Sequence, residues 1–248
     1  MSDKDILIGL NIAGIGYIRL KRLIEVFGGL EEISRGDEFT LRKIDGMGPD
    51  LAGKILSLKD GSALEKERKL IDKERAGILT VFDEGYPENL KNIYDPPIVL
   101  YVKGEIKPED KRAVALVGSR RASLYGLTIC RDLAGALSAR GITVVSGLAR
   151  GIDSAAHKGA LDAGGRTVAV LGSGLNNLYP PENKLLAKRI VDSGALISEF
   201  PMGMAPLKRN FPIRNRVISG LSLGVVVVEA AKKSGALITA YSALEEGR

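Results

Sequence analysis

The sequence predicts an α/β fold in which a mostly parallel sheet is covered by helices on both faces and is preceded by a small helical domain. From residue 113 onward, apolar segments typical of strands alternate with segments whose apolar residues recur at helical spacing. The strand segments show no apolar–polar alternation, which is typical of strands buried on both faces. Residues 1–75 contain only helix-like segments between glycine-rich turns. We therefore expect two domains, 1–75 and 76–248.

The first domain contains a segment, 41–56, that resembles the helix-hairpin-helix motif. Its sequence LRKIDGMGPDLAGKIL indicates a helix, a tight turn and a second helix. Gly46 and Gly48 allow a sharp turn, and Pro49 suits a helix start because that position needs no N–H donor. Residues 10–24 form a weaker copy. The N–H groups of such a helix start can face a DNA phosphate. The domain's 14 basic and 14 acidic side chains favour the alternative, a purely structural role.

The second domain is expected to form the sheet. A charged helix over 62–75 leads to residues 77–104, where ILTVF and IVLYV predict two strands that extend one edge. The later strands are expected at VALVG, ITVVSG, VAVLG, ALISEF and VVVVEA, most of them followed by a helical segment. Ligands of such sheets bind beyond the carboxyl ends of the strands, where the Gly and Ser turns of this sequence lie.

Composition excludes several classes of protein. No run of 18 apolar residues is present and the start MSDKDILIGL lacks the layout of a signal peptide, so we expect no membrane partner. Cys130 is the only cysteine, which rules out a disulfide framework and predicts a cytoplasmic protein. His157 is the only histidine, so the sequence provides no zinc site of His and Cys, and we expect no metal and no cofactor.

The positive charge is concentrated in one part of the chain. Residues 111–248 hold 19 basic and 9 acidic side chains, a net charge of +10, whereas residues 76–110 hold 3 basic and 7 acidic ones. The excess therefore coincides with the strands that end in small-residue turns. This coincidence predicts a polyanionic partner rather than charge that serves solubility alone.

Two strand-to-helix turns carry the residue types that hold phosphates. Glycine permits close approach of the backbone, serine supplies N–H and hydroxyl groups, and arginine supplies a planar fork of donors. The candidates are Gly118, Ser119 and Arg120 in the first turn and Ser146, Gly147 and Arg150 in the second. The spacing is not G-x-G-x-x-G, and no acidic residue ends the second strand, so a dinucleotide site is not supported. Tight structural turns are the alternative.

Two further segments complete the expected site. The loop after VAVLG contains Tyr179, which could stack on a base or pack internally. The segment 207–220, LKRNFPIRNRVISG, interleaves cations with an aromatic ring, which suits single-stranded nucleic acid; a solvated basic loop is the alternative. The candidates from these two segments are Asn183, Lys184, Phe211, Arg214, Asn215 and Arg216.

No catalytic constellation is visible in the sequence. Glu199 and Glu229 lie at strand ends without a His or Cys partner nearby in the chain. Asp153 is expected to cap a helix, and His157 is expected to be structural or on the surface. We therefore expect a binding protein and not an enzyme.

These segments occur together in one order. They are GSR (118–120), SGLARGID (146–153), LGSGLNNLYPPEN (171–183), SEFP (198–201), FPIRNRVISGLS (211–222), VVVEA (226–230) and SGALITA (234–240). The set resembles the DprA/Smf family of bacterial DNA-processing proteins over about residues 77–248. The helical N-terminus fits the small leading domain of that family, of the SAM or helix-hairpin-helix type.

The resemblance implies an extended Rossmann-like core that binds single-stranded DNA without catalysis. It also implies a homodimer that protects incoming DNA and loads the RecA recombinase in natural transformation. The family pocket uses the arginine of GSR, here Arg120, and a lysine directly after the Tyr-Pro of the third loop. Pro181 stands at that position, and Lys184 is the candidate replacement.

The resemblance places the dimer and RecA surfaces near Tyr241 to Glu246. Relatives usually continue beyond the point where this chain ends, so we expect a fragment whose sheet lacks an edge strand.

Two other functions are considered. A phosphoribohydrolase of the lysine-decarboxylase-like (LOG) type shares this Rossmann variant but uses a Pro-Gly-Gly-x-Gly-Thr run, whereas this chain reads VEAAKKSGALIT. A duplex-binding module led by the helix-hairpin-helix segment is the third candidate, and a comparison of single-strand and duplex affinity separates it from the first.

Overall fold

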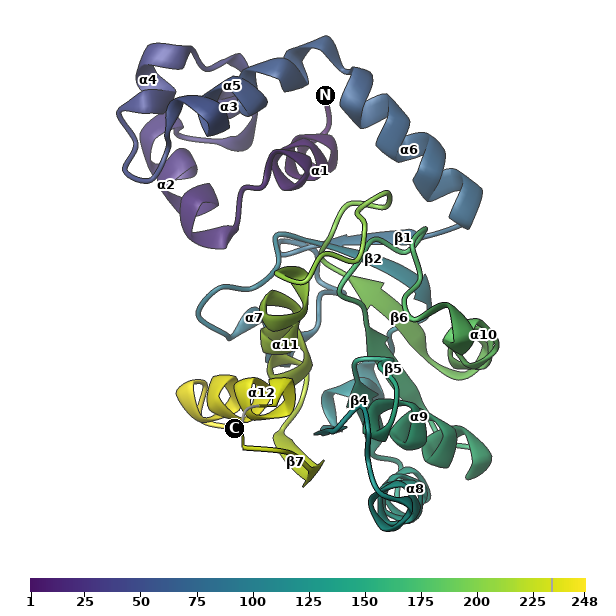
Figure 1. The fold of residues 1–248 in the computed structure, drawn as a ribbon. Helices are drawn as coiled ribbons and strands as arrows, with labels where there is room; N and C mark the ends of the chain where they lie inside the picture. The colour runs from purple at the N-terminus through teal and green to yellow at the C-terminus, as the bar shows by residue number, and fades with distance from the viewer. Residues whose placement is uncertain (233) are drawn as a thin grey trace.

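The computed structural model describes residues 1–232 and 234–248, which form a helical N-terminal part followed by a seven-stranded sheet with helices on both faces (Figure 1). The N-terminal helices are α1 (Asp3–Ala13), α2 (Tyr17–Phe27), α3 (Leu30–Arg35), α4 (Glu38–Arg42), α5 (Pro49–Ser57), the 3₁₀ turn η1 (Leu58–Asp60) and α6 (Ser62–Glu74). The strands are β1 (Gly77–Thr80), β2 (Val99–Gly104), β3 (Ala113–Gly118), β4 (Thr143–Ser146), β5 (Thr167–Val170), β6 (Ala195–Ser198) and β7 (Gly224–Glu229). The helices between and after them are α7 (Glu88–Lys91), η2 (Pro108–Lys111), α8 (Leu124–Ser138), α9 (Ile152–Asp162), η3 (Pro181–Asn183), α10 (Lys184–Ser193), α11 (Asn210–Gly220) and α12 (Gly235–Glu245).

The strand order is β1-β2-β6-β5-β4-β3-β7, and the five strands from β6 to β7 run parallel. Antiparallel β2 and β1 extend the sheet beyond β6, with Tyr101 opposite Ser198. The predicted fold class and the edge extension are thus confirmed. Helices α8, α9 and α10 lie on one face and α7, α11 and α12 on the other, so that β3 to β6 are buried (Figure 1).

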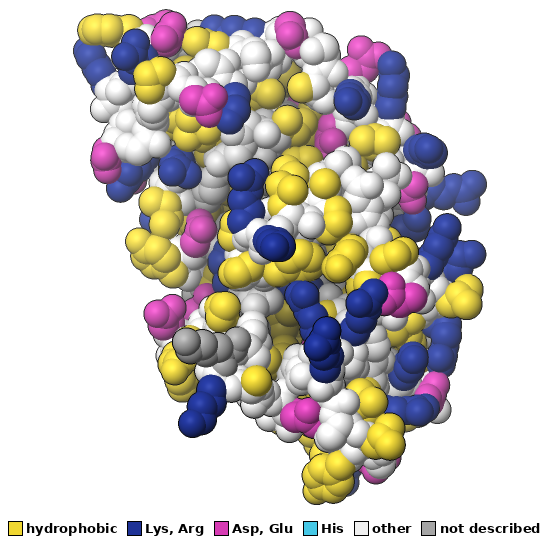
Figure 2. Space-filling view, viewed as in Figure 1, with side chains coloured by type: hydrophobic (Ala, Val, Ile, Leu, Met, Phe, Trp, Pro, Cys, Tyr) yellow, Lys and Arg dark blue, Asp and Glu magenta, His cyan; other side chains and the backbone are white. Residues whose placement is uncertain are grey.

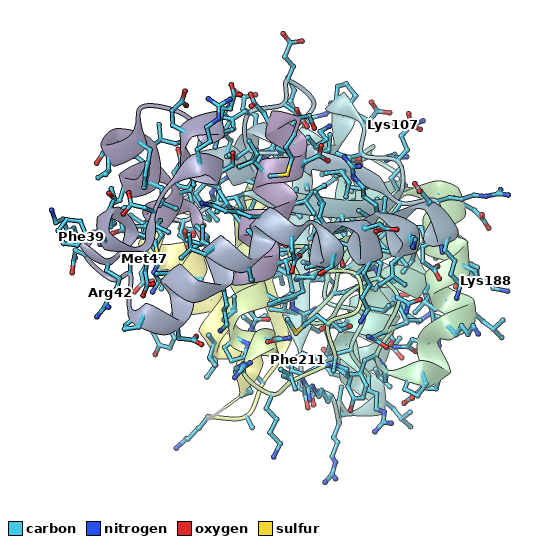
Figure 3. All side chains as sticks on the ribbon, turned by 90° about the horizontal axis from the view of Figure 1, so that it is seen from above. Phe39, Arg42, Met47, Lys107, Lys188 and Phe211 are labelled. Atoms are coloured by element: carbon cyan, nitrogen blue, oxygen red, sulfur yellow. The ribbon has the colours of Figure 1, made fainter. Side chains whose placement is uncertain are left out.

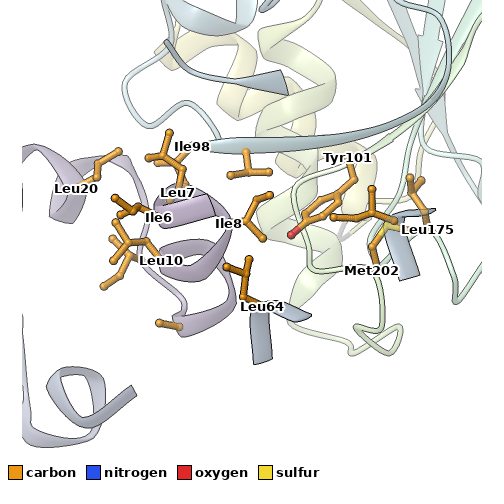
Figure 4. Close-up of a cluster of buried hydrophobic side chains, with 14 of the residues drawn as sticks. Ile6, Leu7, Ile8, Leu10, Leu20, Leu64, Ile98, Tyr101, Leu175 and Met202 are labelled. Atoms are coloured by element: carbon orange, nitrogen blue, oxygen red, sulfur yellow. The ribbon is translucent and has the colours of Figure 1, made fainter. Parts of the chain in front are cut away.

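The N-terminal helices pack on the antiparallel edge of the sheet through a continuous hydrophobic cluster. Tyr101 of β2 is fully buried there beside Ile8 of α1, Leu64 of α6 and Met202 (Figure 4). The Tyr101 hydroxyl donates a hydrogen bond of 3.3 Å to the side chain of Asn11. Helix α6 ends at Glu74 and β1 begins at Gly77, and the buried cluster continues across this junction.

The hairpin geometry expected at 41–56 is present. Gly46 has a φ of +78°, in the left-handed region that favours glycine, and Pro49 occupies the start of α5. A similar turn with Gly14 at φ +86° separates α1 from α2, at the weaker copy.

The segment 207–220 contains a helix that the sequence did not predict. Residues 210–220 form helix α11, most of whose side chains are buried, which disfavours the alternative of a solvated basic loop for this part of the segment. Pro212 is compatible with this helix because it lies in the first turn, where its missing N–H breaks no helical hydrogen bond. None of the helices in the described part of the chain has the length and hydrophobicity needed to cross a bilayer.

Candidate functional site

A pocket of about 710 Å³ opens between the carboxyl end of β3, the loop that follows β5, helix α11 and the start of α12. Its lining includes Val117 to Arg120, Tyr179, Phe211 and Ser234 to Ala236. On this face, Lys and Arg side chains gather around a hollow whose walls carry hydrophobic side chains (Figure 2). The site lies at the edge of the sheet where the sequence predicts ligand binding.

The Gly118-Ser119-Arg120 turn is held tightly by its neighbours. A Cβ at Gly118 would lie 2.5 Å from Ile152 and 2.8 Å from the carbonyl of Glu229, so this position admits only glycine without rearrangement. The Ser119 N–H donates to the Glu229 carbonyl at 2.7 Å, and the Ser119 hydroxyl accepts from the N–H of Arg121 at 3.1 Å. The expectation of a free Ser119 N–H is therefore wrong: the turn uses that group to fix the position of Arg120.

The second loop packs directly on the first. Gly151 has a φ of +72°, and a Cβ there would lie 2.2 Å from the Ser119 carbonyl oxygen. Gly151 also precedes the first residue of α9 and takes the N-cap position that we expected Asp153 to fill. The hydroxyl of Ser146 donates to the Leu116 carbonyl at 2.6 Å, so this predicted ligand joins β4 to β3 beneath the site.

Arg120 and Phe211 form the exposed centre of the site. The Arg120 guanidinium carbon lies 5.2 Å from the centre of the Phe211 ring, within the range of a cation–π contact. The Tyr179 ring lies 5.9 Å from Phe211 at an interplanar angle of 58°. Gly172 makes room for this arrangement, since a Cβ there would lie 2.8 Å from the Phe211 ring.

Arg214 lines the pocket but is almost completely buried. Its side chain is only 4% exposed, and its Nη1 donates to the carbonyl oxygens of Gly147, at 2.7 Å, and Val170. Burial lowers the pKa of Arg214 to about 10, while the nearby Asp153 carboxylate favours the charged guanidinium. Arg214 therefore remains charged at neutral pH and ties the ends of β4 and β5 together. A Cβ at Gly147 would lie 2.4 Å from the guanidinium, so a larger residue here would displace Arg214 from these carbonyl oxygens.

Arg216 faces the N-terminal helices and not the pocket. It donates to the Asp95 carbonyl at 2.6 Å and forms an ion pair with Glu199. The Glu199 carbonyl in turn accepts from the Asn11 side chain at 3.0 Å. Burial raises the pKa of Glu199 to about 7, although the Arg216 charge opposes that shift. Arg216, a candidate from the segment 207–220, is therefore not among the residues described as lining the pocket.

The remaining predicted residues divide between the site and the scaffold. Asn215 lines the pocket and donates to the Gly235 carbonyl at 3.1 Å. Arg150 lines a small adjoining cavity with Arg120 and Tyr179, and its side chain pairs with Glu182.

Asn183 and Lys184 do not reach the pocket. Asn183 is buried and donates to the Leu148 carbonyl at 2.8 Å. Lys184 is exposed at the start of α10 and lies outside the described lining of both cavities. Lys188 of the same helix projects from the molecule well away from Phe211, and Phe39 and Arg42 project from the N-terminal helices at the opposite side (Figure 3).

The start of α12 completes the pocket and was missed as a site segment. Ser234, Gly235 and Ala236 line it, together with Pro206 and Lys208. The sequence does contain a signal here, because VVVVEA is another apolar strand followed by a Ser-Gly pair and a helix.

Neither candidate carboxylate is placed for acid–base chemistry in the pocket. The Glu229 carboxylate accepts from the Ser123 N–H at 3.0 and 3.1 Å and from its hydroxyl at 2.6 Å, so it anchors the start of α8.

His157 is fully buried, its Nδ1 lies 2.7 Å from the Thr167 hydroxyl, and burial lowers its pKa to about 3, which confirms a structural role. Over residues 1–232 and 234–248, no three His, Cys, Asp or Glu side chains gather in a way that could hold a metal ion.

Comparison with known proteins identifies the family. Residues 77–248 match the family model described as DNA recombination-mediator protein A. Protein Smf of Synechocystis sp. is 39% identical over 96% of this chain and 61% of its own length, so the chain spans about three-fifths of that relative.

Two solved structures are also similar. The X-ray structure of DNA processing protein A (DprA) from Streptococcus pneumoniae has a TM-score of 0.84 and 34% identity over 100% of this chain and 85% of that one. The Helicobacter pylori DNA processing protein A, whose structure concerns a single-stranded DNA binding mode, has a TM-score of 0.63 and 31% identity over 70% of this chain and 79% of that one. Together with the motifs at the pocket, these matches show that the chain belongs to the DNA recombination-mediator protein A family, the DprA/Smf family.

Proposed function

We propose that this protein binds single-stranded DNA at the Arg120–Phe211 pocket and acts as a DNA-processing protein without catalysis. The observation that carries the proposal is the exposed guanidinium of Arg120 over the Phe211 ring, with Tyr179 beside it. A cation that meets the backbone phosphate and rings that stack on bases suit single strands of any sequence. Asp153, which is buried, is the one acidic side chain in the described lining of the pocket, so little negative charge opposes a phosphate.

The similarity to the Helicobacter pylori protein supports the same ligand, since its structure concerns single-stranded DNA binding. We propose on the same basis that the protein is cytoplasmic, protects incoming DNA in natural transformation and loads a RecA-type recombinase. Homodimerisation and recombinase contact are assigned to α12, whose Tyr241 and Leu244 side chains are exposed. These two exposed apolar side chains support the assignment of a protein-interaction surface to α12.

Substitution of Arg120 by glutamate tests the ligand and the pocket together. We expect Arg120→Glu to weaken binding of a labelled oligo-dT by about 10- to 100-fold, because one charge-assisted contact is lost and a repulsive charge is added. The matched control is Arg140→Glu, an equal charge change at an exposed residue. Arg140 lies just before β4, at the amino ends of the strands and therefore opposite to the pocket. Equal affinities of the Arg120 and Arg140 variants, measured by fluorescence anisotropy, would show that the pocket is not the binding site.

A further inference from the structure

An exposed apolar surface lies beside the pocket, at the start of α8. Leu124 is 85% exposed and Tyr125 is 77% exposed, the largest and third-largest exposures among the large hydrophobic side chains described. Ile129, one turn further along the same side of the helix, is 42% exposed. A group of hydrophobic side chains is visible at the bottom of Figure 2, where α8 lies in Figure 1.

The backbone beneath these side chains is firmly held. Ser123 caps α8 by accepting from the Gly126 N–H at 3.0 Å, and Ser123 is itself bound by the Glu229 carboxylate at the end of β7. Gly126 lets the helix start approach Glu229, since a Cβ there would lie 2.3 Å from a carboxylate oxygen. Leu124 and Tyr125 therefore project from a fixed first turn and not from a loose loop.

The charge around this surface is positive. Arg120 and Arg121 are exposed, and neither forms an ion pair with any described residue, whereas the nearby carboxylate of Glu229 is taken up by Ser123. Tyr125 is four positions after Arg121, so their Cα atoms lie within roughly 14 Å of each other. The two unpaired guanidinium groups offer the phosphates of a nucleic-acid strand a charge-assisted contact. A strand of phosphates and bases is complementary to both the cations and the Tyr125 ring.

We propose that Tyr125 and Leu124 form a second base-stacking subsite, outside the pocket, for single-stranded DNA that continues past Arg120. Arg121 contacts the phosphate between the two subsites. The DNA path then leaves the pocket over the β3–α8 turn toward the β7 edge of the sheet. This inference rests on the proposed function and extends it, since it assigns the path of the DNA across the protein surface and a longer binding site.

The test compares wild type, Tyr125→Ala and Tyr125→Phe on oligo-dT of increasing length. The control is Tyr94→Ala, which removes a tyrosine that is 82% exposed in the segment between α7 and β2. For the shortest oligonucleotide that the wild type binds, we expect all four proteins to agree. For longer ones, Tyr125→Ala should bind about 5- to 100-fold more weakly, the loss of one stacked base, while Tyr125→Phe and Tyr94→Ala should match the wild type. Photo-crosslinking of an iodouracil-substituted strand should label Tyr125.

Three results would overturn the proposal. Unchanged affinity of Tyr125→Ala at every length would remove the subsite. A change in the oligomeric state of the DNA-free protein on Tyr125→Ala, measured as its molar mass in solution, would make this surface a protein interface. Failure of the wild type to bind any oligonucleotide would overturn the proposed function, and this subsite with it, and so is distinguished from the first two results.

Discussion

Three arginines near the pocket illustrate how one residue type takes three roles. Arg120 is exposed over Phe211, Arg214 is buried and holds the carbonyl oxygens of Gly147 and Val170, and Arg216 pairs with Glu199. A buried cation is stable only when its donors are satisfied, and Arg214 meets this requirement with backbone carbonyls at two strand ends. Two of the four cations in the segment 207–220, Arg214 and Arg216, thus hold the fold together, whereas Lys208 is exposed and lines the pocket with Arg120.

The Glu199 carboxyl predicts a pH dependence of stability. Its folded-state pKa of about 7 is above the ordinary value, so the folded protein holds this proton to a higher pH than the unfolded chain does. At pH values between the unfolded-state and folded-state pKa of Glu199, the folded state binds more protons than the unfolded chain. The stability of the folded state must therefore fall as the pH rises through that interval.

Urea denaturation at a series of pH values checks this prediction. We expect the free energy of unfolding of the wild type to decrease from about pH 4.5 to about pH 7.5, and Glu199→Gln to lose that component of the slope. Parallel curves for the two proteins would mean that Glu199 titrates normally in the fold.

At this scale the sequence predicts a residue's place better than its exposure. Arg120 follows a glycine at the end of an apolar strand, so its position at the ligand edge can be read from the chain. The burial of Arg214 depends on carbonyl oxygens at Gly147 and Val170, which are 67 and 44 residues away in sequence. No local pattern carries such information.

The helices and strands also differ in how well the sequence predicts them. All seven strands were expected, because their buried apolar segments and their glycine or serine ends are local signals. Helix α11 was not expected, because Pro212 and the charged residues of this segment mask the helical spacing of the apolar residues that pack under the sheet. Tertiary packing decides such a segment, and local propensity does not.

The hairpin between α4 and α5 gives a test at the scale of an element. Gly46 has a φ of +78°, so Gly46→Ala should destabilise the protein by about 1–2 kcal/mol through strain in the left-handed region. Gly53, exposed within α5 and with open space at its Cβ position, is the matched control. Gly53→Ala should stabilise the protein by about 0.5–1 kcal/mol. Urea denaturation measures both changes, and equal effects of the two substitutions would contradict the assigned hairpin geometry.

The whole molecule combines a neutral helical part with a basic sheet domain. Residues 1–75 carry 14 basic and 14 acidic side chains, and residues 111–248 carry a net charge of +10 from 19 basic and 9 acidic ones. The two parts share one hydrophobic cluster around Tyr101, so the helices are fixed relative to the ligand edge of the sheet. Under the proposed function, this distribution of charge predicts that the attraction for DNA lies on the sheet domain.

The central claim is that the pocket binds single strands through a cation and stacking rings. The most direct test is a titration of labelled oligo-dT, and of a duplex of equal length, with the wild-type protein at several salt concentrations. We expect tighter binding of the single strand, with an affinity that falls linearly on logarithmic axes with a slope of about −0.7 for each phosphate neutralised. Equal or tighter binding of the duplex, or an affinity that does not change with salt, would contradict the account.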